Sequence, residues 1–109
     1  MVLDYRGKDA VYLEEVRGPR GNAAQRWRIH DIGGGLEVIE NVRLSRERKT
    51  PMVLDYGNKD SVYLETRRGP KGNAAQRWRL PSVEDGRKLL VNVRLSDKHH
   101  RPMVLDYRD

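Results

Sequence analysis

The sequence of 109 residues predicts an all-β fold made of a tandem repeat. The motif MVLDY begins at Met1, Met52 and Met103, so the period is 51 residues, and units 1–51 and 52–102 align without a gap at 29 identical positions. Short runs of Val, Leu, Ile, Tyr and Trp alternate with Gly- and Pro-containing turns, which is typical of β-proteins. No segment of eleven or more residues has the 3.6-residue period of an amphipathic helix.

Four short strands are expected in each unit. In the third strand, Trp27 and Ile29 share an apolar face while Arg26 and Arg28 lie on the opposite face, so one face is expected to be buried and the other solvated. The same alternation marks the second strand, and glycines mark the connections. The expected strands are 2–5, 11–14, 25–29 and 38–44 in unit one, and 53–56, 62–65, 76–80 and 89–95 in unit two.

A chain of this length fits a single domain, 1–109, with repeat units 1–51 and 52–102 and a terminal segment 103–109. The terminal segment repeats the first strand, so it is either a closing strand or a strand exchanged with another chain. A spare strand favours pairing with a second copy, and we therefore expect a homo-oligomer.

The composition excludes several classes of protein. The chain has no cysteine, so it has no disulfide framework and no cysteine zinc site. No apolar run approaches the ~20 residues of a membrane-spanning helix. The N-terminus lacks the pattern of a signal peptide, which favours the cytosol unless a leader has been removed. A net charge of +6 and a pI near 9.9 favour anionic partners or simply a well-solvated basic surface.

The sequence does not suggest an enzyme, a metal site or a cofactor. No serine lies in a nucleophile elbow, and no pair of carboxylates stands out as an acid and base. His30, His99 and His100 all lie in connections that differ between the units. Adjacent strand residues point apart, so the His99–His100 pair is a poor metal site. Two similar units fit multivalent binding better than a single asymmetric active site.

Each unit resembles the ricin-type β-trefoil repeat. The matching pieces, in order and in both units, are VLDY, VYLE, GNAAQRW, and a glycine followed by IEN (39–41) or LVN (90–92). The resemblance implies a β-trefoil-like fold and carbohydrate binding. A trefoil needs three units, so the chain would close as a two-fold barrel sealed by 103–107, exchange segments among three chains, or be truncated.

The resemblance also implies where sugar would bind. In the family, an Asp of the first strand and an Asn before the Gln-x-Trp bind sugar hydroxyls, and an aromatic ring stacks on the sugar. Here Ala24 and Ala75 replace that Asn, and Glu14 and Glu65 replace the ring, so only a shifted pocket would be complete. Its candidate carbohydrate-binding residues are Asp4, Tyr12, Asn22 and Gln25 in unit one, and Asp55, Tyr63, Asn73 and Gln76 in unit two.

Structural roles compete with these functional ones. The Asp side chains can instead bind turn amides, the Gln side chains backbone groups, and the Tyr rings neighbouring strands, while Trp27 and Trp78 are expected in the core. The arginines beside the tryptophans can pair with Glu14 and Glu65, or form a basic stripe. The RGPRG and RGPKG loops are solvated turns or anion sites. The candidate anion-binding residues are Arg17, Arg20, Arg67, Arg68 and Lys71.

The sequence therefore predicts a non-enzymatic, lectin-like module that binds glycans at duplicated sites. The alternative is a basic module for anionic polymers, meaning sulfated glycans or nucleic acid. A third possibility is a structural repeat protein that assembles through its spare strand.

Overall fold

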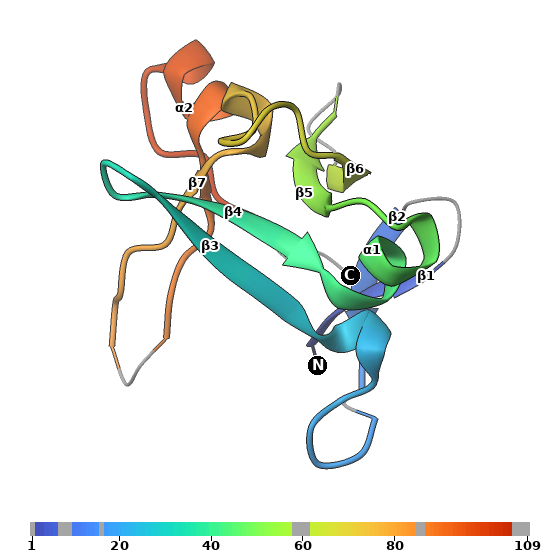
Figure 1. Cartoon of the computed structure of the whole chain (residues 1–109). Coiled ribbons are helices and arrows are strands. Elements are labelled where there is room, and N and C mark those ends of the chain that lie inside the picture. The colour runs from blue at the N-terminus through green and yellow to red at the C-terminus, as the bar shows by residue number, and fades with distance from the viewer. Residues whose placement is uncertain (1, 7–9, 16, 58–61, 85–86, 106–109) are drawn as a thin grey trace.

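A computed structural model gives the fold of residues 2–6, 10–15, 17–57, 62–84 and 87–105, and the side chains at positions 2, 6, 10 and 12–14 lie outside this description (Figure 1). The chain is mostly β-structure with two short helices. Its elements are β1 (Val2–Arg6), β2 (Ala10–Glu14), η1 (Ala23–Gln25), β3 (Trp27–Gly33), β4 (Leu36–Asn41), α1 (Val42–Arg48), β5 (Met52–Tyr56), β6 (Val62–Thr66), η3 (Ala74–Gln76), β7 (Trp78–Arg79), β8 (Val91–Asn92) and α2 (Val93–His99).

The eight strands of the described residues belong to one antiparallel sheet. Its order is β1-β2-β6-β5-β4-β7-β8, and β3 pairs with β4 outside this path. The first two strands of each unit form a hairpin, with Asp4 opposite Tyr12 in unit one and Asp55 opposite Tyr63 in unit two. Strand β4 joins the units, because Glu40 pairs with Val53 of β5 and Glu37 pairs with Trp78 of β7.

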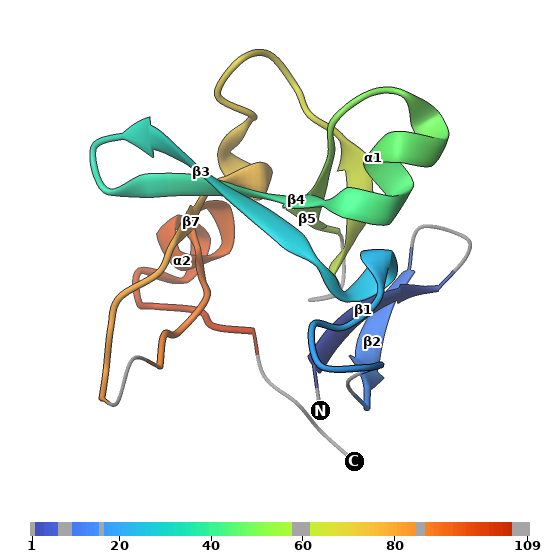
Figure 2. The same ribbon diagram turned by 60° about the horizontal axis from the view of Figure 1, so that its bottom comes forward.

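The fourth predicted strand of each unit is wrong in its second half, because a helix begins there. Asn41 and Asn92 end β4 and β8, and their side-chain oxygens accept hydrogen bonds from the backbone N–H of Leu44 and Leu95, both at 3.0 Å. These are N-caps, and they start α1 and α2. Each helix packs against the 3₁₀ helix of its own unit, where the Asn Nδ2 donates to an alanine carbonyl (Figure 2).

The third predicted strand begins two residues later than expected in both units. Gln25 and Gln76 lie in 3₁₀ turns, capped by Asn22 and Asn73, and the strand starts only at the tryptophan. In unit two, β7 has two residues, whereas β3 has seven. The chain after β7 leaves the sheet and returns as β8.

The core lies between the sheet and the two capped turns. Trp78 is 1% exposed, as predicted, and its Nε1 donates to the carbonyl of Leu54 at 3.1 Å; Trp27 is half-buried and bonds Leu3 in the same way. The expectation that Ile29 shares a buried face with Trp27 is wrong, because Ile29 is 53% exposed. The buried apolar cluster comprises Tyr5, Ala24, Ile39, Leu44, Met52, Leu54, Leu64 and Trp78.

Residues 103–105 begin the third copy of the first-strand motif, and they pair with unit two as the second copy pairs with unit one. Val104 forms a bridge with Val91 of β8, matching the pairing of Val53 with Glu40. The N–H of Leu105 donates to the carbonyl of Leu90 at 2.9 Å. Asp106 and Tyr107, which complete the repeated motif, lie outside the described residues.

Candidate functional site

The predicted sugar-binding Asp and Gln residues meet inside the protein. Gln25 Nε2 donates to Asp4 Oδ2 at 3.0 Å, and Gln76 Nε2 donates to Asp55 Oδ2 at the same distance. Both carboxylates belong to residues that are 4% exposed. The structure thus unites these candidates, but their oxygens face the interior and not an open pocket.

The rest of each glutamine is also bound to protein groups. Gln76 Nε2 donates to the carbonyl of Thr66 at 2.9 Å, and its Oε1 accepts from the N–H of Arg68 at 2.9 Å. Gln25 makes the matching bonds to the carbonyl of Glu15 and the N–H of Arg17. Each glutamine therefore connects the end of the second strand to the RGP loop through backbone groups, which is the structural role considered for it from the sequence.

Asn22 and Asn73 are occupied by capping. Each side-chain oxygen accepts from the N–H of the glutamine three residues later, at 3.2 Å. Asn22 is exposed and Asn73 half-buried, so their amide nitrogens can still face solvent. They lie beside the Asp–Gln pair through the short 3₁₀ turn.

Tyr63 lies beside Asp55 across the β5–β6 hairpin and is half-buried. Burial raises the pKa of Tyr63, and the charges of Asp55 and Glu65 raise it further. Burial also raises the pKa of Asp55 above 3.8, while the bond from Gln76 lowers it. The side chain of Tyr12, the counterpart in unit one, lies outside the described residues.

The RGP loops are held closed by arginines that follow the 3₁₀ turns. The Arg26 guanidinium donates to the carbonyls of Arg20 (3.4 Å) and Gly21 (3.0 Å), and Arg77 bonds Lys71 and Gly72 in the same way. Arg26 and Arg77 therefore brace these loops. The side chain of Glu14 lies outside the described residues, and Glu65 Oε1 accepts from the N–H of Thr66 at 3.0 Å. The anion-binding candidates Arg17, Arg20, Arg68 and Lys71 are exposed, and Arg67 is half-buried.

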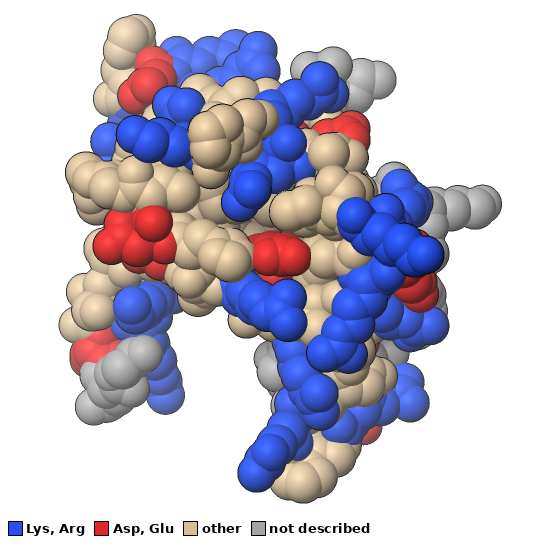
Figure 3. Space-filling model, viewed as in Figure 1, with Lys and Arg blue, Asp and Glu red and all other residues tan. Residues whose placement is uncertain are grey.

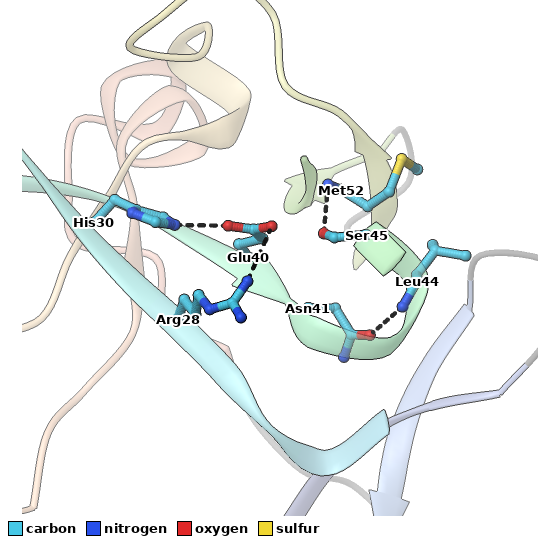
Figure 4. Close-up of polar contacts among 7 residues, drawn as sticks. All are labelled: Arg28, His30, Glu40, Asn41, Leu44, Ser45 and Met52. Carbon is cyan, nitrogen blue, oxygen red and sulfur yellow. Dashed lines mark hydrogen bonds and ion pairs between the residues drawn. The ribbon is translucent and has the colours of Figure 1, made fainter. Parts of the chain in front are cut away.

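A buried carboxylate links β3 to β4 in unit one. Glu40 Oε1 is 2.7 Å from His30 Nε2, and its Oε2 is 3.9 Å from the Arg28 guanidinium (Figure 4). Burial raises the pKa of Glu40, but hydrogen bonds with His30 and Ser45 and the charges of His30 and Arg28 together hold it below 4.5. Glu40, Arg28, Arg46 and Lys49 line a shallow hollow of about 260 Å³.

A larger basic surface includes the unit-one part of the expected basic stripe, Arg26 and Arg28 with the RGP loop, and extends over α1, which the sequence did not predict. Lys and Arg side chains form a continuous band that runs over α1, past η1 and onto the loop before η1 (Figure 3). All of its members in unit one are exposed. We define the unit-one basic band as the exposed Arg and Lys residues of the loop before η1, the C-cap of η1, the start of β3, and α1 with its C-cap, namely Arg17, Arg20, Arg26, Arg28, Arg43, Arg46, Arg48 and Lys49.

The repeat provides an internal comparison for this band. Positions 51 residues later carry Arg68, Lys71, Arg77, Arg79, Arg94, Asp97, His99 and His100. Unit two thus keeps five of the eight positive charges, exchanges two for histidine and reverses one to aspartate. The contrast between Arg46 and Asp97 lies on the exposed side of α1 and α2, so the two units present different charge to solvent.

A second cavity, of about 950 Å³, lies where the tip of the β3–β4 hairpin meets unit two. Leu80, Pro81 and Leu89 give it apolar walls, and Glu37 lines it from unit one. Within the described part of the chain, no three His, Asp or Glu side chains come together to hold a metal ion, and no helix is long and apolar enough to cross a membrane.

Comparison with known proteins adds no relative: no family model, no curated protein and no solved structure matches the chain. The function must therefore be argued from the geometry of the repeat and its surface.

Proposed function

We propose that the chain is a glycan-binding module without enzymatic activity, and that its ligands are sulfated or otherwise anionic glycan chains. The observation that carries this proposal is the unit-one basic band, in which eight exposed cationic residues follow one another across α1 and the RGP loop. Arginine binds sulfate and carboxylate groups with paired hydrogen bonds, so a row of arginines suits a repetitive anion.

The geometry of the duplicated motif supports this choice over a neutral-sugar lectin. Both Asp–Gln pairs are buried and satisfied by protein groups, so a sugar would have to displace internal hydrogen bonds to reach the carboxylates. The side chains of the band are exposed, so an anion can reach them from the surface. The resemblance of the repeat to ricin-type units supports glycans as the class of ligand. It also supports a trefoil-like arrangement of the units.

The salt dependence of binding tests the proposal. Each anionic contact releases counterions, so affinity for a sulfated glycan should fall steeply with salt, with a slope on logarithmic axes that grows with the number of contacts. We expect Arg46→Asp to weaken binding and flatten that slope. Lys98→Asp on α2 makes the same change in net charge away from the band and serves as the matched control.

Two outcomes would overturn the proposal. One is that the chain shows no affinity for sulfated glycans at low salt. The other is that Arg46→Asp and Lys98→Asp weaken binding equally, because the effect would then come from net charge and not from the band. Tighter binding to single-stranded or duplex nucleic acid than to any sulfated glycan would instead favour nucleic acid as the ligand.

A second candidate is a neutral-sugar site in unit two. The half-buried Tyr63 ring lies across the hairpin from Asp55, and aromatic rings stack on sugar faces. Binding of a neutral glycan that persists at high salt and disappears in Tyr63→Ala would support it. Binding that is unaffected by this substitution would exclude the site.

A further inference from the structure

Apolar residues at equivalent positions of the repeat differ sharply in exposure. Val38 is fully buried, whereas Leu89, 51 residues later, is 42% exposed; Val53 is fully buried, whereas Val104 is 43% exposed. On the other side, Ile29 is 53% exposed, whereas its counterpart Leu80 is packed against the core. Among the described residues, Val83 is the one other large apolar side chain with comparable exposure.

The buried members of these pairs lie where unit one meets unit two. Val38 of β4 faces the RGP loop of unit two, since a Cβ placed on Gly72 would be 3.5 Å from Val38 Cγ2. Val53 pairs with Glu40 across the same junction, and Leu80 lines the cavity with Glu37. Contact between the units is therefore what covers these positions.

The exposed members form two faces that correspond to the two sides of that junction. Leu89 lies on a tail face of unit two, which matches the surface around Val38 that unit one offers to unit two. Val104 of the terminal segment lies beside β8 as Val53 of unit two lies beside β4. Gly21 and Ile29, with the half-buried Trp27, form a head face on unit one, which matches the surface that unit two offers to unit one. The head face of one copy thus carries Gly21, Trp27 and Ile29 at the positions that Gly72, Trp78 and Leu80 hold in unit two.

We propose that this chain associates head to tail, the tail face of one copy binding the head face of the next through the contacts that join its own two units. Leu89 would then pack against Gly21 as Val38 packs against Gly72. An interface of this heterologous kind joins different surfaces of identical chains, and it gives rings or extended arrays according to the rotation between copies.

The first strand is interchangeable in this arrangement. Residues 1–6 and 103–108 have the same sequence, MVLDYR. The place beside β8 where Val104 lies is therefore suited equally to the first strand of an incoming copy. Exchange of identical strands between copies has little intrinsic cost, as in domain swapping.

Charge sets a condition on the interface. Inside the chain, Glu37 lines a cavity together with Arg79. Lys88 is the unit-two counterpart of Glu37, and Arg28 is the unit-one counterpart of Arg79. Lys88 of one copy would therefore approach Arg28 of the next. Like charges repel less when salt screens them. Association between copies should therefore strengthen with salt, which is the reverse of the behaviour expected for glycan binding by the basic band.

Two substitutions of exposed residues test the proposal without removing core packing. Ile29→Glu places a charge on the head face and Leu89→Glu on the tail face, while Val83→Glu changes an equally exposed apolar residue outside both faces. Sedimentation equilibrium and light scattering would measure the mass over a wide range of concentration. Circular dichroism and urea unfolding would establish that each variant is folded, and Ile29→Ser and Leu89→Ser replace any variant that is not.

We expect the unaltered chain and Val83→Glu to associate as concentration rises, and the head and tail variants to remain single chains. An equal mixture of Ile29→Glu and Leu89→Glu should form a 1:1 dimer and nothing larger, because one intact tail and one intact head remain. A single-chain mass for the unaltered protein at every concentration would overturn the proposal. So would association of either variant alone, or a mixture that stays monomeric.

Discussion

Gln76 donates to Asp55 at 3.0 Å, and Gln25 repeats the same bond to Asp4 at the same distance 51 residues earlier. The pair connects the first strand of each unit to the turn that precedes its tryptophan. Because Gln76 is fully buried and Gln25 is 9% exposed, the two copies allow the contribution of burial to be compared within one chain.

Replacing Gln76 should lower the free energy of unfolding substantially. Gln76→Ala leaves the Asp55 carboxylate, the Thr66 carbonyl and the Arg68 N–H without their side-chain partner. The Asp55 carboxylate is buried, and an unsatisfied buried group costs about 1–3 kcal/mol, or more when it is charged. We expect a loss of about 3 kcal/mol in the free energy of urea unfolding. Gln25→Ala should cost less, since water reaches that site more easily. Equal losses for the two variants would contradict the role assigned to burial.

Asp55 should make stability depend on pH. Its pKa in the folded protein lies above 3.8, so its stabilising contribution is complete below that pH and is lost as pH rises through the raised value. Asn can still accept from Gln76 but carries no charge. We expect Asp55→Asn to be more stable than the unaltered chain at neutral pH, by on the order of 1 kcal/mol, with the advantage shrinking in acid. Unfolding midpoints measured from acid to neutral pH would show this, and an advantage that grows in acid would refute it.

The pKa shift of Glu40 should change the pH dependence of stability in the opposite direction from that of Asp55. Its pKa is held below 4.5, so it contributes stability above that pH that is lost as pH falls through the lowered value. Glu40→Gln is expected to destabilise the protein by about 1 kcal/mol at neutral pH and to have no effect in strong acid. Glu47→Gln, which removes an exposed partner of Arg43, is the control and should change stability by less than about 0.5 kcal/mol.

The left-handed residue that ends α2 offers a stabilising substitution. His100 has φ 56°, a conformation that glycine adopts without the clash of a Cβ. We expect His100→Gly to raise the free energy of unfolding by about 0.5–1 kcal/mol, since relief of strain exceeds the added entropy of the unfolded chain. Thermal unfolding would measure the gain, and a lower midpoint would show that the His100 side chain contributes contacts of its own.

The strands could be predicted from the sequence, but the helices could not. In 42–48 the apolar residues Val42 and Leu44 are two positions apart, which is the spacing of a strand, and seven residues are too few to show a helical period. What ends β4 is a tertiary arrangement: Asn41 caps the helix and also bonds the carbonyl of Ala24. That second bond depends on packing between distant parts of the unit.

The same error hid the part of the basic band that lies on α1. The predicted strand ended at Leu44, so it gave Arg46 no relation to Arg43, whereas a helix puts residues three apart side by side. The sequence did single out the Asp and Gln residues that meet in each unit. It did not show that the carboxylates turn inward, because a strand position beside a turn is compatible with either direction.

Strand β4 has a consequence for how the protein unfolds. It pairs with β3 of its own unit and with β5 and β7 of the next, and its last four residues are all buried. Neither unit can melt by itself without removing a pairing partner from the other. The two repeats should therefore lose their structure in a single cooperative transition, with the amide hydrogens of β4 among the slowest to exchange with solvent.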